Sequence, residues 1–269
     1  MGRVLFLGNS HIAAYKLAYD APSSAFPRDC AFFCARAGDL AFTRVEGRAI
    51  VATERAAMAR DELMYFFPDG VAPALEARYL SRGEPLAEVG EQFEQTGGSR
   101  SIELDGVDVI FYAAGISPYD TRRLEAEIAP RSPGLTREML RLMLRDRFLL
   151  RNQVRAIREV APDIRHYLLG MPLRGRAPLE LSPQVLAMVA ARRAALSRMC
   201  GDYVFDDVFM PGESVLAGDL LSVRPEFFVR GRELAEEYQG VPRTQSDELH
   251  VNSSYAEVVF DEFIGPRIP

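Results

Sequence analysis

One serine and one histidine, at opposite ends of the chain, have the surroundings that nucleophilic catalysis requires. Ser10 follows the apolar run at residues 4–7 and Gly8, and it comes just before a helical pattern. Near the other end, Asp247 precedes His250 by three residues, just before a second helical pattern. A serine nucleophile needs a base that takes its proton, and the base needs a carboxylate to fix its tautomer. The three residues therefore predict acyl chemistry through a triad.

The elements around Ser10 decide whether it can serve as a nucleophile. The apolar run indicates a buried parallel strand, and residues 12–19 indicate the helix that follows it. In an open α/β sheet, ligands bind at the carboxyl ends of the strands, where the first turn of a helix offers free backbone N–H groups. Ser10 is thus expected at the mouth of a site. The alternative is structural, because Asn9 and Ser10 are residue types that favour ordinary helix caps.

A serine after the first strand, followed much later by Asp-x-x-His before the last helix, resembles the SGNH (GDSL-like) hydrolase family. The resemblance implies a three-layer α/β/α sandwich with a mostly parallel five-stranded sheet in flavodoxin-like order. It implies Ser10 as nucleophile, His250 as base and Asp247 as the partner that orients the base. It also implies an oxyanion hole that uses the backbone N–H of Gly38, although a glycine after a strand is equally explained by a turn.

Two positions depart from the pattern of that family. Asn9 stands where the family has aspartate, which leaves the triad itself unchanged. Ser117 stands where the family has the asparagine of Gly-x-Asn-Asp, and a hydroxyl is shorter and less directional than an amide. Losing one oxyanion donor costs about 3 kcal/mol of transition-state stabilisation. His11, next to the nucleophile, is expected either to line the pocket or to lie at the surface.

These residues predict a serine esterase or deacetylase that hydrolyses a small O-acyl ester, with a carbohydrate ester among the candidate substrates. An O-acyltransferase of the same fold is the near alternative. A binding protein that keeps the hydrolase scaffold, weakened in catalysis by Ser117, is the alternative from a different class.

Apolar strands alternate with helical patterns along the chain, which predicts an α/β fold with a parallel sheet. We expect one domain over residues 1–269, with insertions at about 41–105 and 207–246. The first insertion contains an aromatic stretch at 64–67, which could be core or pocket wall, and it ends in a strand at 101–104 and a turn at Asp105-Gly106. Further strands are expected at 31–34, 107–114, 167–171 and 203–205, and further helices at 136–160, 183–199 and 255–263.

Composition limits the partners. The net charge of -6 argues against a general nucleic-acid binder, whose affinity comes from neutralising phosphates. The net charge does not rule out a local basic patch. The arginines within 137–158 are expected on a solvated helix face, with an anion-binding stripe as the alternative. No apolar run is as long as a membrane span. An odd number of cysteines, Cys30, Cys34 and Cys200, fits buried thiols in a reducing cytoplasm, and we expect a cytoplasmic protein.

Other chemistries have no motif in this sequence. A Walker A loop, a G-x-G-x-x-G after the first strand and an H-E-x-x-H are all absent, so we expect neither a cofactor nor a metal. Ser214 begins like a nucleophile elbow but lacks the closing glycine, and we set it aside. His166 is expected to be structural or exposed.

Overall fold

The structure is a computed structural model of the whole chain. It describes residues 2–8, 11–34, 43–52, 100–113, 150–170, 205–216, 223–229 and 247–269, together with single helical positions between 183 and 198. At 151–152, 229 and 247–250, the backbone alone is described.

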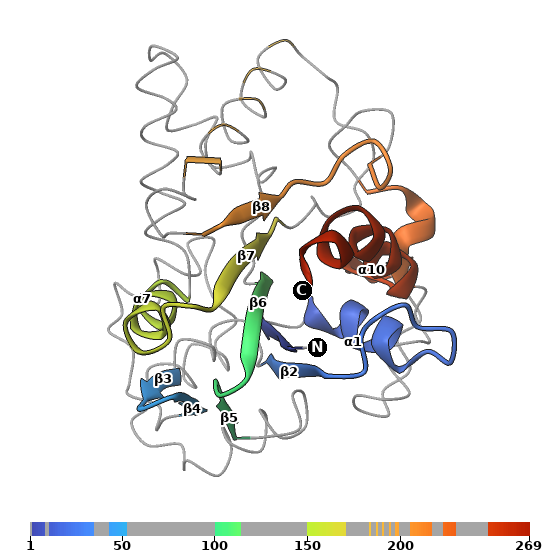
Figure 1. Cartoon of the computed structure of the whole chain (residues 1–269). Coiled ribbons are helices and arrows are strands. Elements are labelled where there is room, and N and C mark those ends of the chain that lie inside the picture. Colours follow the sequence, from blue (N-terminus) through green and yellow to red (C-terminus); the bar gives the residue numbers. More distant parts are fainter. Residues whose placement is uncertain are drawn as a thin grey trace, which may run out of the picture.

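A five-stranded parallel sheet forms the centre of the molecule (Figure 1). Its order is β2-β1-β6-β7-β8, and every neighbouring pair is parallel. Counted among themselves along the chain, these strands have the order 2-1-3-4-5, which doubly wound sheets of the flavodoxin type also have. The predicted α/β class with a five-stranded parallel sheet is confirmed. The strands are β1 (Arg3–Gly8), β2 (Cys30–Cys34), β6 (Val107–Ala113), β7 (Arg165–Leu169) and β8 (Asp207–Phe209).

The central strands are apolar on both faces because helices cover both faces of the sheet. On one face lie α1 (Ile12–Asp20) and α10 (Ser253–Val259), which pack against each other, and on the other lies α7 (Arg151–Val160) (Figure 1). The continuous burial of residues 4–7 follows from this arrangement, since alternate side chains enter two different cores. The helix ending at residue 160 confirms the end of the helix predicted over 136–160. The described positions between 183 and 198 are helical, as predicted.

The last strand of the sheet differs from its prediction. The sequence predicts a strand at 203–205, whereas β8 spans Asp207–Phe209. Phe205 is buried without being part of the strand, because its ring packs edge-on against Tyr112, with 5.5 Å between the ring centroids. An apolar residue can thus be buried just before a strand and be mistaken for it.

A second sheet lies beside the amino ends of the central strands. It consists of β3 (Thr43–Glu46), β4 (Ala49–Ala52) and β5 (Ser101–Glu103), all antiparallel. The predicted strand at 101–104 is confirmed, as is the turn that follows it, where Gly106 has φ of 74°. The hairpin of β3 and β4 was not foreseen from the sequence. Residues 53–99, which include the aromatic stretch at 64–67, lie outside the described residues.

The C-terminal part of the chain builds one wall of the molecule. A 3-10 turn at Pro225–Phe227 leads into β9 (Phe228–Val229), which pairs antiparallel with β10 (Asp247–Val251). The helix predicted over 255–263 is confirmed: α10 continues into a π-helical turn at Phe260–Ile264 and a 3-10 turn at Gly265–Arg267. Asp247 and His250 lie in β10, a strand that was not predicted from the sequence.

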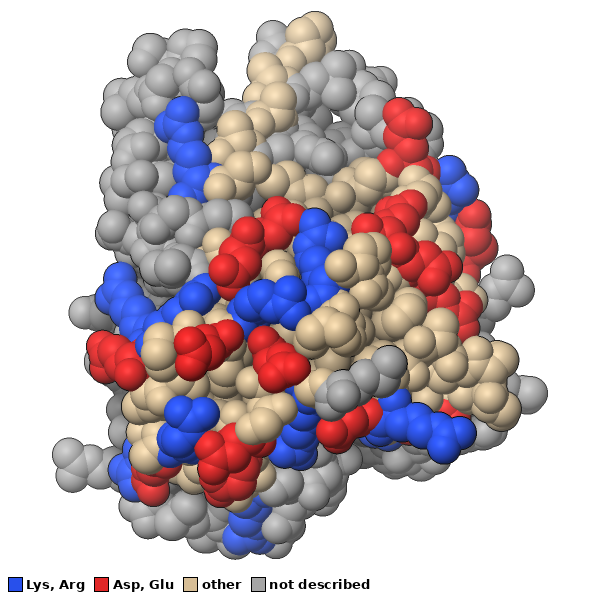
Figure 2. Space-filling model, in the orientation of Figure 1, with Lys and Arg blue, Asp and Glu red and all other residues tan. Residues whose placement is uncertain are grey.

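Acidic and basic side chains are interspersed on the face of the molecule in Figure 2. Several of the described arginines form ion pairs: Arg48 with Asp105, Arg158 with Asp206 and Arg267 with Asp207. Arg158 belongs to the predicted arginine-rich helix, and its partner Asp206 lies outside that helix, just before β8. Among the described residues, no helix has the length and apolar character needed to cross a membrane.

His166 is a buried polar residue on the α7 side of the sheet, so its structural interpretation is confirmed and exposure is excluded. Its Nδ1 lies 2.7 Å from the hydroxyl of Tyr112, and the two rings stack. Among the described residues its Nε2 has no hydrogen-bond partner. Burial, with a smaller contribution from the guanidinium of Arg158, lowers the pKa of His166 to about 3. The imidazole is therefore neutral in the folded protein at neutral pH.

Acidification should weaken the fold through His166. The pKa of His166 in the folded protein lies below its unfolded value of about 6.5. The contribution of the neutral imidazole to the free energy of unfolding is therefore complete above pH 6.5 and declines as the pH falls toward 3. At pH 5 the expected loss in free energy of unfolding is about 2 kcal/mol relative to pH 8. Urea unfolding at several pH values should give a steeper acid decline for the wild type than for His166→Gln, which cannot titrate. If the stability of the two proteins declined equally with falling pH, His166 would not be the group responsible.

Candidate active site

A small hollow opens at the carboxyl ends of the central strands, where α1 and α10 come together. Its volume is about 10 Å³, which is room for about one water-sized group. Two of its walls are strand ends, namely Ala113 at the end of β6 and Leu169 at the end of β7. The described residues that line it are His11, Tyr15, Ala113, Leu169, Gly170, Val251 and Tyr255.

The hollow joins the two distant segments that the sequence singled out. His11 directly follows Ser10, and Val251 directly follows His250. Both His11 and Val251 line the same hollow, although 240 positions separate them in the chain. The turn after β1 and the end of β10 therefore meet at one place on the carboxyl edge of the sheet.

Only some of the predicted site residues are among the described residues. Ser10, Asn9, Gly38 and Ser117 lie outside them, and Asp247 and His250 are described by the backbone of β10 alone. The predicted triad and oxyanion hole therefore remain predictions. His11 is partly buried and lines the hollow. It also occupies the N-cap position of α1, where its side chain makes no capping hydrogen bond.

Asn252 fixes the junction between β10 and α10, two residues after His250. Its side-chain oxygen accepts a hydrogen bond from the backbone N–H of Tyr255, which caps the helix. Its amide group donates to the carbonyl oxygen of Glu226 at 2.7 Å, and its own backbone N–H donates to the carbonyl oxygen of Phe227 at 2.8 Å. One side chain thus sets the end of β10, the start of α10 and the position of Tyr255 in the wall of the hollow.

Gly8, the last residue of β1, lies very close to the backbone of the neighbouring strand β6. A Cβ atom at this position would lie 2.2 Å from the carbonyl oxygen of Ala113 and 2.9 Å from Cδ1 of Ile12. The first contact is with backbone that the sheet holds in place, so a side chain cannot be accommodated without a shift of β1 against β6. The absence of a side chain at Gly8 therefore places the end of β1 directly beside the hollow.

The wall of the hollow is apolar apart from a few polar atoms. Leu169 and Val251 contribute aliphatic surface, and Tyr15 and Tyr255 contribute rings that are almost fully buried. Burial raises the pKa of the Tyr15 hydroxyl well above its usual value, so this group is a neutral hydrogen-bond donor. Within the described part of the chain, no cluster of His, Cys, Asp and Glu side chains is suited to hold a metal ion.

Sequence reasoning placed Tyr15 and Tyr255 in helices without assigning them to the site. For Tyr15 the signal was available, since it follows His11 by four residues and such a spacing brings two side chains to one helix face. Tyr255 carries no such signal, because its place depends on how α10 packs against α1. Ser214, which we set aside, donates a hydrogen bond at 2.9 Å to the carboxylate of Glu262 at the surface.

In comparisons with models of protein families, with curated proteins and with solved structures, no match to this chain was found. The interpretation of the site therefore depends on its own residues and geometry.

Gly8→Ala should destabilise the protein by about 1–3 kcal/mol, because the new methyl group meets the backbone of β6. The matched control is Gly212→Ala, whose Cβ would have no atom within 4 Å. Urea unfolding measures both variants. Equal stabilities for the two variants would show that β1 can move away from β6 without cost.

Asn252→Ala should cost about 1–2 kcal/mol, because it removes the cap of α10 and the bond to residue 226. Asn252→Asp keeps an oxygen for the cap and loses the amide donor, so its loss should be smaller. Ser254→Ala, at an exposed position in the same first turn, serves as the control and should change little. If all three variants melt alike, the junction does not depend on Asn252.

Proposed function

We propose that this protein is a serine esterase or deacetylase that hydrolyses a small O-acyl ester of a small molecule or glycan in the cytoplasm. Ser10 is the nucleophile, His250 the general base and Asp247 the carboxylate that orients the base. The observation that carries the proposal is the shared hollow. Its lining includes the residue after Ser10 and the residue after His250, at the edge of a parallel sheet where ligands bind.

The reaction proceeds in two stages. Oγ of Ser10 attacks the carbonyl carbon of the ester while His250 takes the hydroxyl proton. The bond from that carbon to the alcohol oxygen then breaks, and the alcohol leaves with the proton from His250. In the second stage, water attacks the carbonyl carbon of the acyl-serine while His250 takes one of its protons. The bond from that carbon to Oγ then breaks, Oγ of Ser10 takes the proton from His250, and the acid is released.

The start of α1 favours the negative charge that develops during each stage. Backbone N–H groups in the first turn of a helix are without intrahelical partners, and the helix dipole is positive there. The oxyanion would bind to the backbone N–H of Ser10 and of Gly38. Ser117 takes the place of the asparagine that would supply a third donor.

The departure at Ser117 favours one second candidate, a binding protein on the same scaffold. A single missing donor can lower the rate a hundredfold or more without affecting ligand binding. Turnover of short-chain esters that is lost in His250→Ala would exclude this candidate.

Labelling with a fluorophosphonate probe tests the proposed nucleophile. The wild type should be labelled, and Ser10→Ala should not be, because the probe forms a covalent bond with an activated serine. Ser214→Ala is the matched control, since Ser214 is a surface serine beside a carboxylate, and this variant should be labelled like the wild type.

Absence of labelling in the wild type, or equal labelling of Ser10→Ala, would overturn the proposal. If the protein turns over an ester, the reaction is repeated with added alcohols. The ratio of free acid to new ester then shows whether the acyl group passes to water or to the alcohol.

A further inference from the structure

Tyr15 is a buried residue of α1 whose hydroxyl makes no hydrogen bond to the described residues. Tyr15 is 4% exposed, and its ring stacks on Phe6 with 5.7 Å between the ring centroids. Its hydroxyl is not among the fully enclosed side-chain atoms that lack a partner, so a water-sized group can reach it. This donor can therefore bind a small group from outside the protein, because no acceptor among the described residues competes for it.

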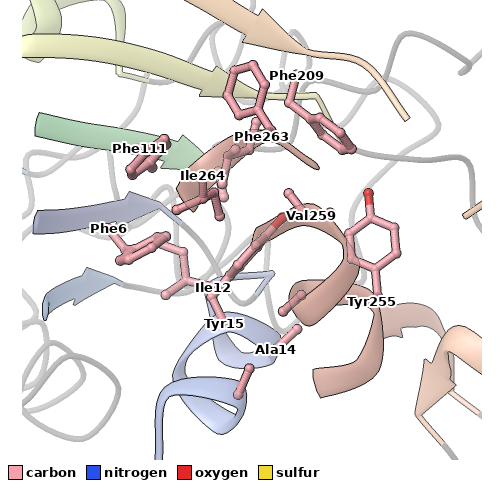
Figure 3. Close-up of a cluster of buried hydrophobic side chains, with 14 of the residues drawn as sticks. Phe6, Ile12, Ala14, Tyr15, Phe111, Phe209, Tyr255, Val259, Phe263 and Ile264 are labelled. Atoms are coloured by element: carbon pink, nitrogen blue, oxygen red, sulfur yellow. The ribbon is translucent and has the colours of Figure 1, made fainter. Parts of the chain in front are cut away.

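The surroundings of this hydroxyl indicate a ligand atom. The ring of Tyr15 extends from α1 into the space between α1 and α10 (Figure 3), and it lines the hollow. The hollow has room for about one water-sized group, which is too little for an acyl chain. A single oxygen atom fits this space, and an oxygen atom can accept a hydrogen bond from the hydroxyl of Tyr15.

The hollow also lies where such an oxygen would react. His11 and Val251, the neighbours of Ser10 and His250, form other parts of its wall. In the proposed reaction, the ester carbonyl oxygen must lie near both the nucleophile and its base, and this oxygen becomes negatively charged. A preorganised donor in a hollow with few polar atoms stabilises that charge more strongly than water does.

We propose that the hydroxyl of Tyr15 donates a hydrogen bond to the carbonyl oxygen of the substrate and to the oxyanion formed from it. Tyr15 is then a catalytic residue that supplies the third donor, which Ser117 cannot match. This inference rests on the proposed esterase function. It assigns to α1 two contributions to the site, the nucleophile before its first turn and an oxyanion donor one turn later.

The test compares two tyrosines that are one turn apart on the same helix. Tyr15→Phe removes the hydroxyl in the hollow. Tyr19→Phe removes a hydroxyl that donates to the carbonyl oxygen of Arg28 at 2.8 Å, away from the hollow. With p-nitrophenyl acetate as substrate, Tyr15→Phe should lower kcat about 100-fold with little change in KM, and Tyr19→Phe should match the wild type.

Thermal unfolding supplies the readout that a structural role would change. Because the Tyr15 hydroxyl has no partner among the described residues, Tyr15→Phe should melt no lower than the wild type. A wild-type kcat in Tyr15→Phe, with Ser10 still labelled by the fluorophosphonate, would overturn this inference alone and leave a structural water as the occupant. A wild type without labelling would instead overturn the proposed function.

Discussion

The stack of aromatic rings around Phe6 is the constraint on which the site depends. Phe6 is fully buried in β1, and its ring stacks on Phe32 of β2, on Phe111 of β6 and on Tyr15 of α1, with centroid separations of 5.0, 5.4 and 5.7 Å. One side chain therefore ties α1 to three adjacent strands. Rings of this size bury large apolar areas and have few alternative packings, so they fix the helix in position over the sheet.

The position of α1 in turn brings the two ends of the chain together. α10 packs against α1, and the cap at Asn252 joins α10 to β10. His11, at the start of α1, and Val251, at the end of β10, consequently line one hollow together with Tyr15. Tyr15, whose ring stacks on Phe6, also lines the hollow, so the core and the candidate site share a residue.

The sequence was sufficient for the elements with strong local signals. The run at 4–7, the central strand beginning at Val107 and the helix after residue 252 are continuous or periodic enough to be recognised alone. The hairpin at 43–52 is short and half polar, and its place follows from tertiary contacts, namely the pairing of β4 with β5 and the hydrogen bond from Gln153 of α7 to Thr43. The buried state of His166 and the hollow are products of tertiary packing, which local patterns do not contain. The sequence pointed to two segments whose described residues His11 and Val251 line one hollow, whereas the role inferred for Tyr15 required the packed structure.

The central claim is that the fold brings Ser10 and His250 together as nucleophile and base. A crystal structure of the protein tests it most directly, through the distance between Nε2 of His250 and Oγ of Ser10. The account predicts a separation of about 2.6–3.2 Å, or a single water molecule that bridges the two atoms. Side chains that point to different sides of the hollow, with no bridging water, would contradict it.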